Sequence, residues 1–271
     1  MAVFDGPGVR ETVFLKGCPL RCRWCHNPEG LSVMPQLMVS RPSCTHCGRC
    51  ESVCPSPGRC TACGACTRVC PNNLRKICGV DYTSEELAKL LLKDRELLTA
   101  LGGGVTFSGG EPTLQGQFVL DTVRQLEGMH CAIETCGYCE AGMFRAVISA
   151  MDYVMMDIKL ADDEAHRHWT GVSNRLILSN LEYLKHSGKP FRIRIPVIPG
   201  VNDSDENFDA TAKLLRGAET LEQVELLSYH KTAGAKYTMV DMEYTPGFET
   251  DLKPRLNTGA FEKYGIKCTA M

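Results

Sequence analysis

The sequence lacks long apolar runs, an excess of positive charge and anything that resembles a secretory signal. No apolar stretch approaches the roughly 20 residues that cross a bilayer. Lysine and arginine number 30 against 32 aspartates and glutamates, a formal net charge of −2, so no basic field attracts nucleic acid or an anionic membrane. The opening residues, MAVFDGPGVRETVF, contain no charged region followed by an apolar run. We therefore expect a soluble, cytoplasmic protein with no nucleic-acid or membrane partner.

Cysteine, in contrast, is abundant. The chain has 16 cysteines, and eleven of them lie between positions 18 and 70. A secreted disulfide scaffold is the alternative, but such scaffolds usually have fewer than about 100 residues and a signal peptide. Metal binding is the better interpretation. The five cysteines outside the dense region are interpreted as packing residues, because free cysteine is among the most buried residue types; they are Cys78, Cys131, Cys136, Cys139 and Cys268.

Two identical cysteine runs follow one another in the densest segment. Each reads C-x2-C-x2-C-x3-C-P, the pattern of bacterial ferredoxins with two clusters, in which the fourth cysteine of each run binds the other cluster. The zinc alternative requires cysteine pairs separated by about 12 to 20 residues. The pattern predicts one 4Fe–4S cluster on Cys44, Cys47, Cys50 and Cys70. It predicts a second on Cys60, Cys63, Cys66 and Cys54.

This segment reads as an insertion in a larger domain. Five prolines between positions 35 and 71 leave little room for long helices. Regular periodicity resumes at TSEEL, where Thr83 or Ser84 is a candidate N-cap and Glu86 completes a capping box. The predicted organisation is a barrel start at 1–33, a ferredoxin-like insert at 34–80 and the rest of the barrel at 81–271.

Strand-like and helix-like segments alternate outside the insert. Strands are predicted at 11–17, 104–110, 131–137, 153–160, 191–200 and 224–229. Several are nearly continuous apolar runs, as expected of parallel strands that are buried on both faces. An eight-fold barrel needs about 250 residues, more than the insert leaves. The pattern therefore predicts an α/β fold with six βα units, a partial (β/α)6 barrel.

The polar groups of these units follow the ends of the strands. A third cysteine set, C-x3-C-x2-C, comes after the first strand; SGGEP follows the second; ETCG, DIK and SYH end later ones. Parallel barrels carry their chemistry at the carboxyl ends of their strands. The three cysteines are Cys18, Cys22 and Cys25. With only three ligands in this loop, a bound metal keeps an open position, as reactive sites do.

These motifs resemble those of the radical S-adenosylmethionine (SAM) superfamily, and the chain is most similar to its glycyl-radical-enzyme activating enzymes. The resemblance runs over nearly the whole chain, through DGPGVR, CRWCHNPEG, VTFSGGEPTLQ, VMMDIKL and LLSYHKTAGAKY. It implies a partial (β/α)6 barrel. The ferredoxin-like run marks the subgroup with two additional clusters.

The resemblance also implies the chemistry of the open position. Cys18, Cys22 and Cys25 would hold three irons of a 4Fe–4S cluster, and the fourth iron would bind the amino and carboxylate groups of SAM. An electron from this cluster would split SAM into methionine and a 5′-deoxyadenosyl radical. Three 4Fe–4S clusters and SAM are thus the implied cofactors.

Further site residues are carried over from the family. The backbone of Gly109 and Gly110 would meet the SAM amino group, with Glu111 bracing the loop, and Lys159 would contact the SAM carboxylate. His230 would lie beside the methionine moiety, Asn27 would contact the ribose, and Arg194 joins the cofactor-binding set. Oxygen atoms that match a monovalent-cation site belong to Glu134, Thr135, the Met155 carbonyl and Asp157; a family example has aspartate at the position of Glu134.

The implied function is an activase that removes a hydrogen from a glycine Cα of a glycyl radical enzyme. The implied electron donor is a protein such as flavodoxin or ferredoxin. Two alternatives stay open: a radical SAM enzyme that acts on a small molecule or peptide, and a ferredoxin-type electron carrier. SAM binding distinguishes the carrier from both enzymes.

Overall fold

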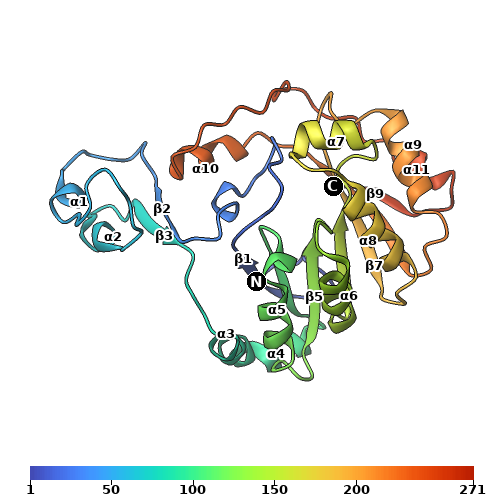
Figure 1. Ribbon diagram of the computed structural model, residues 1–271, viewed down its shortest axis with the longest axis horizontal. Coiled ribbons are helices and arrows are strands. Elements are labelled where there is room, and N and C mark those ends of the chain that lie inside the picture. Colours follow the sequence, from blue (N-terminus) through green and yellow to red (C-terminus); the bar gives the residue numbers. More distant parts are fainter.

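Seven parallel strands form the main sheet of the chain in the computed structural model, which describes residues 1–271 (Figure 1). Each strand pairs in parallel with its neighbours. In spatial order they are β1 (Arg10–Leu15), β4 (Gly104–Gly109), β5 (His130–Thr135), β6 (Tyr153–Asp157), β7 (Phe191–Val197), β8 (Leu221–Ser228) and β9 (Cys268–Ala270).

Helices connect these strands, and most of them cover the outer face of the sheet. They are α3 (Ser84–Leu91), η2 (Leu92–Asp94), α4 (Arg95–Ala100), η3 (Pro112–Gln115), α5 (Gly116–Val123), α6 (Ala141–Ala150), α7 (Asp163–Thr170), α8 (Arg175–Lys185), α9 (Asp205–Leu214), α10 (Ala233–Met239) and α11 (Gly259–Glu262). None combines the length and the apolar character that a membrane crossing requires. The main core of 33 buried residues lies between sheet and helices, where Phe107 and Ile133 pack with Val119 and Val147.

The predicted partial barrel is confirmed, and five of the six predicted strands start within one residue of the observed ones. The sixth, β8, begins three residues earlier than predicted. Strand β9 was missed because its three residues carry no periodic signal. The predicted capping box is also confirmed. Thr83 accepts a hydrogen bond from the Glu86 amide, and the Glu86 side chain accepts one from the Thr83 amide.

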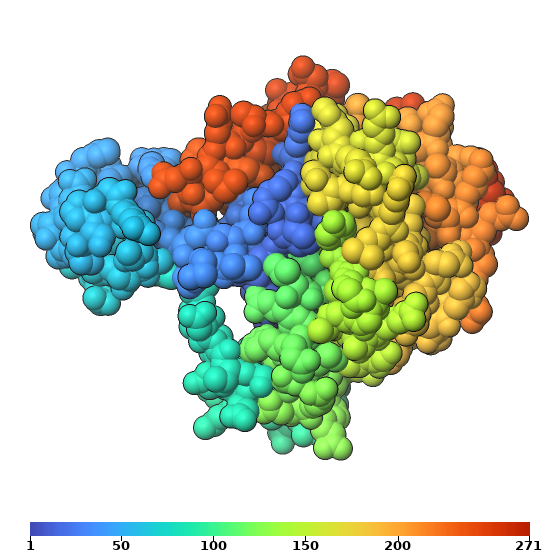
Figure 2. Space-filling view, viewed as in Figure 1, coloured from blue at the N-terminus to red at the C-terminus, as the bar shows by residue number.

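Residues 36–78 form a separate small unit between β1 and β4. Its two strands, β2 (Gln36–Val39) and β3 (Arg75–Cys78), pair antiparallel, with Gln36 opposite Cys78. Two short helices, α1 (Arg49–Ser52) and α2 (Ala65–Val69), lie between them. This unit projects from one side of the barrel (Figures 1 and 2). Its division from the barrel at 34 and 80 stays a prediction.

Helix α10 lies between this unit and the loop that follows β1. It packs against β2 on one side and against η1 (Pro28–Gly30) on the other. In Figure 2, the orange-red segment that contains α10 spans the space between the unit of residues 36–78 and the barrel. The unit is therefore held by a non-covalent contact in addition to its two chain connections.

Candidate active site

One cavity of about 320 Å³ collects most of the predicted site residues at the carboxyl ends of the barrel strands. It lies where the loop after β1 meets the ends of β4, β5, β6 and β7. The predicted residues that line it are Cys18, Cys22, Cys25, Asn27, Gly109, Gly110, Glu134, Thr135, Asp157, Lys159 and Arg194. The strand-end convergence expected from the sequence is therefore present.

Three predicted residues, Glu111, Met155 and His230, do not line this cavity. Glu111 is fully buried behind it. His230 is exposed, and its ring lies edge-on to His26, with 4.4 Å between the centroids. His26 does line the cavity, so His230 reaches the site only through its neighbour.

The three thiols of the first loop are unpaired and partly buried. Burial raises the pKa of Cys22 to about 12 and raises that of Cys25. A hydrogen bond from Cys136 lowers the pKa of Cys18. Buried thiols ionise when a positive centre lies against them, and metal binding supplies such a centre. The donor set thus suits iron.

The arrangement of the three thiols is also compatible with a cluster. Nowhere in the chain do three Cys, His, Asp or Glu side chains converge as ligands of one metal ion. A cubane cluster does not require that convergence, because each cysteine binds a different iron. Three thiols around one cavity therefore suit a cluster that binds one cysteine through each of three irons.

The glycines of SGGEP are required by close backbone contact with the cysteine loop. Gly109 has φ of +117°. A Cβ on Gly110 would lie 2.2 Å from the carbonyl oxygen of Gly17 and 2.6 Å from that of Gly30. The Gly110 amide donates to Leu15 O at 2.8 Å. These two glycines therefore hold the end of β4 against the loop that carries the thiols.

Glu111 joins this loop to the end of β5. Its Oε1 accepts hydrogen bonds from the Thr113 amide and hydroxyl and from Thr135 Oγ1, at 2.6 to 3.0 Å. Its Oε2 accepts from the Cys136 amide at 2.7 Å. A buried carboxylate with this many donors is well compensated. It acts as a brace between two loops that line the cavity.

Lys159 brings a buried positive charge to the cavity wall. Its Nζ donates to Asp157 Oδ2 at 2.8 Å, and 11% of its side chain is exposed. Burial alone lowers the pKa of Lys159, but the neighbouring Asp157 carboxylate, which also accepts its hydrogen bond, outweighs the effect of burial, so the pKa rises. The ammonium group is therefore charged and available to an anionic ligand group.

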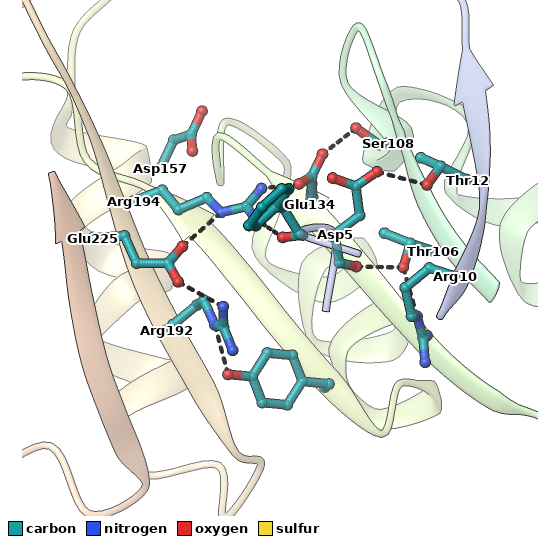
Figure 3. A network of polar contacts seen from close by, with 12 residues as sticks. Asp5, Arg10, Thr12, Thr106, Ser108, Glu134, Asp157, Arg192, Arg194 and Glu225 are labelled. Atoms are coloured by element: carbon teal, nitrogen blue, oxygen red, sulfur yellow. Dashed lines mark hydrogen bonds and ion pairs between the residues drawn. The ribbon is translucent and has the colours of Figure 1, made fainter. Parts of the chain in front are cut away.

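A second group of charged side chains begins at the cavity wall and extends to Arg192 and Glu225 (Figure 3). Arg194 Nη1 donates to Glu134 Oε1, and Ser108 Oγ donates to Glu134 Oε2. Arg194 Nε also donates to Glu225 Oε2 at 3.0 Å. Glu225 in turn accepts from Arg192 Nη1 at 2.5 Å. One guanidinium thus holds two carboxylates from different strands.

Sequence reasoning missed Ser108, Arg192 and Glu225 in this group. A signal was present in β7, where FRIRIPV alternates apolar and polar residues and buries Phe191, Ile193 and Ile195. That alternation places Arg192 and Arg194 on the barrel interior. Arg194 is the register partner of Glu225 on β8.

Arg10 of the DGPGVR motif was also left without a role. Its side chain is fully buried and donates to Thr106 Oγ1 at 3.0 Å and to the carbonyls of Val105 and His130. It ties β1 to β4 and β5 below the cavity. Its role is structural.

Two more cavities lie in the unit formed by residues 36–78. One, of about 340 Å³, is lined by Cys44, Cys47, Cys50 and Cys70. The other, of about 330 Å³, is lined by Cys54, Cys60, Cys63 and Cys66, and also by Cys50. In both, the fourth cysteine comes from the other run. The two cavities thus group the cysteines as the ferredoxin pattern does, apart from Cys50, which lines both. That either group binds a cluster stays a prediction.

Comparison with known proteins identifies the class to which this fold and site belong. The family model of the radical SAM superfamily matches residues 12–215. The chain belongs to the radical SAM superfamily. SuiB from Streptococcus suis bound to SAM has the same fold, with a TM-score of 0.57 over 97% of this chain, 50% of that chain and 10% identity.

More similar proteins narrow the class to one group of activating enzymes. The trans-4-hydroxy-L-proline dehydratase activating enzyme of Clostridioides difficile is 41% identical over 90% of this chain and 86% of its own length. The choline trimethylamine-lyase activating enzyme of Oleidesulfovibrio alaskensis is 36% identical over 89% and 85%. A domain of a pyruvate-formate lyase-activating enzyme from Bacteroides vulgatus aligns with a TM-score of 0.51 and 27% identity, over 62% of this chain and 99% of that one. Within the superfamily, this chain is a glycyl-radical-enzyme activating enzyme.

Proposed function

We propose that the cavity at the strand ends binds a 4Fe–4S cluster and SAM, and that the chain uses them to activate a partner glycyl radical enzyme. The observation that carries this proposal is the meeting of three unpaired thiols, a glycine loop and a buried charged lysine around one cavity. When bound, the cluster supplies the single electron that splits SAM into methionine and the 5′-deoxyadenosyl radical.

The chain's own residues bind and orient SAM in this proposal. Lys159 pairs with the SAM carboxylate, while Gly109 and Gly110 offer backbone groups to its amino group. Asn27 lies at the cavity edge, where its Oδ1 accepts from Lys236 at 2.9 Å, and it contacts the ribose. His230 acts at the methionine side through its contact with His26.

The hydrogen donor is a glycine Cα of the partner enzyme. Glycine has no Cβ to block the approach of the 5′ carbon, and the radical that forms is delocalised over two peptide groups. The activating enzymes named above support this assignment.

We also infer that residues 34–80 form a ferredoxin-like insert with two further 4Fe–4S clusters, which brings the total to three. The support is the pair of cavities whose cysteines match the two predicted ligand sets. A duplicated ferredoxin pattern is an electron-transfer module. The insert therefore receives electrons from a protein such as flavodoxin or ferredoxin and passes them to the SAM-bound cluster.

Anaerobic mixing tests the proposed function. The reduced protein, SAM and a candidate glycyl radical enzyme are combined and followed by electron paramagnetic resonance. A doublet from one α-hydrogen should form on the partner, with an equal amount of 5′-deoxyadenosine, and should collapse when the target glycine is deuterated. Formation of 5′-deoxyadenosine with no radical on any tested partner would favour a small-molecule or peptide substrate.

A further inference from the structure

The side-chain oxygen atoms expected to bind a monovalent cation already have partners within the chain. Arg194 and Ser108 donate to the two oxygens of Glu134. Thr135 Oγ1 donates to Glu111 Oε1 at 2.8 Å. Asp157 Oδ2 accepts from Lys159 at 2.8 Å. A cation of this kind needs several oxygens directed at one point. Here the side-chain oxygens are directed at four different neighbours, Arg194, Ser108, Glu111 and Lys159.

Three carboxylates near this point are also ion-paired without an added ion. Three carboxylates, those of Glu134, Asp157 and Glu225, face three cationic groups, those of Lys159, Arg192 and Arg194. Only 3% of the Glu225 side chain and 11% of the Arg194 side chain are exposed. A further cation would find each of these three carboxylates already ion-paired and would have to displace a cationic side chain, which is costly for a buried pair.

Arg194 has the chemistry to replace such an ion. Its guanidinium is always charged and presents several donors in a planar fork, whereas an alkali ion must be bound and desolvated. Nη1 donates to Glu134, Nε to Glu225 and Nη2 to the carbonyl oxygen of Phe4. The group is therefore fixed on three sides (Figure 3).

The identity of residue 134 agrees with this arrangement. Glutamate is one methylene longer than aspartate, which lets a carboxylate that starts on β5 reach a guanidinium on β7, two strands away. An aspartate would hold its oxygens closer to the β5 backbone. We propose that Arg194, paired with Glu134, takes the place of a monovalent cation beside the SAM site, so that SAM binding by this chain does not depend on Na⁺ or K⁺.

This inference rests on the proposed function, and calorimetry of SAM binding tests the two separately. The reconstituted protein is titrated with SAM in KCl, in NaCl and in tetramethylammonium chloride at equal ionic strength. The dissociation constant of the wild type should differ by less than about twofold among the three salts, because no ion binds together with SAM. A loss of about tenfold or more without an alkali ion would overturn the inference. A protein that binds SAM in none of the salts would instead overturn the proposed function.

Shortening residue 134 should create the dependence that the wild type lacks. In Glu134→Asp, SAM affinity should fall about tenfold in tetramethylammonium chloride, the scale of a lost charged hydrogen bond, and K⁺ or Na⁺ should restore most of it. Arg194→Lys gives a second route, since an ammonium group cannot serve both carboxylates as a fork does. Glu182→Asp on the exposed face of α8 is the matched control, and its binding should match the wild type in every salt.

Sodium-23 relaxation gives a readout that needs neither turnover nor SAM. The wild type should broaden the sodium signal no more than Glu182→Asp does, while Glu134→Asp should broaden it further. Broadening by the wild type that Glu134→Asp removes would mean that Glu134 binds the ion, and the inference would be wrong.

Discussion

The ammonium group of Lys236 lies 2.6 Å from Oε1 of Glu29, which ties α10 to the loop that carries the three active-site thiols. At the C-terminal end of the same helix, Arg41 donates to the carbonyl of Thr238 and pairs with Asp241. Helix α10 thus connects the unit of residues 36–78 to the active-site loop.

Reversing one charge at this contact should loosen the insert. In Asp241→Arg, like charges face each other at Arg41, and amide hydrogen exchange in residues 36–44 should rise up to about fivefold, the scale of one exposed ion pair. The double variant Arg41→Asp with Asp241→Arg should restore protection. Asp251→Arg, which breaks the Lys231 pair in the same segment, is the control. Equal exchange in all four proteins would show that the contact does not hold the insert.

Iron content tests the number of clusters. Anaerobic reconstitution should load about twelve irons, four for each of three cubane sites. Joint replacement of Cys18, Cys22 and Cys25 by alanine should lower this to about eight and abolish SAM cleavage. Saturation near four irons, or a preference for zinc, would contradict the assignment.

If electrons pass through the insert, damage to its clusters should affect SAM cleavage with some electron donors and not with others. Replacing Cys47 and Cys63 by serine should impair SAM cleavage driven by flavodoxin, because both insert clusters lose a ligand. Cleavage driven by a small chemical reductant should survive, because such a reductant reaches the active-site cluster directly, and SAM binding should be unchanged. Full turnover with flavodoxin would mean that the insert serves docking or stability instead.

Removing the positive charge of Lys159 should weaken SAM binding with little effect on folding elsewhere. In Lys159→Met, the affinity for SAM should fall by about tenfold or more, since the lost contact is a charged one. Lys213→Met is the matched control, because Lys213 is an exposed lysine that also pairs with an aspartate. Calorimetry measures both. Equal affinities would remove Lys159 from the SAM site.

Glu111 should contribute to stability as a brace. In Glu111→Gln, one carboxylate oxygen becomes an amide NH₂ that cannot accept from the Cys136 or Thr135 donors, and the free energy of unfolding should fall by about 1–3 kcal/mol. Urea unfolding of the apoprotein measures this. Glu127→Gln, at an exposed turn, should change it little. A stable Glu111→Gln protein would mean that the two loops are held without this carboxylate.

The parts of the site that could be predicted from the sequence are short and local. Cys18, Cys22 and Cys25 lie within eight positions, and the glycine loop follows a strand that its apolar run makes plain. The pairing of Glu134 with Arg194 joins residues on β5 and β7, and nothing local signals it. The indirect position of His230 depends on how the loop after β8 folds against His26. Both contacts depend on the order of the strands in the sheet and on how loops pack, and neither can be predicted from one segment of the sequence.

The two ends of the small unit lie side by side, because Gln36 and Cys78 are paired residues at the base of one hairpin. In an antiparallel pair, such residues have Cα atoms only about 4.5–5.5 Å apart. A chain that left out everything between them could close the gap with a short turn and leave β1, β4 and the thiol loop in place. Evolution could therefore gain, lose or exchange this cassette without redesigning the catalytic barrel, and a protein engineer can use the same junction to transplant it.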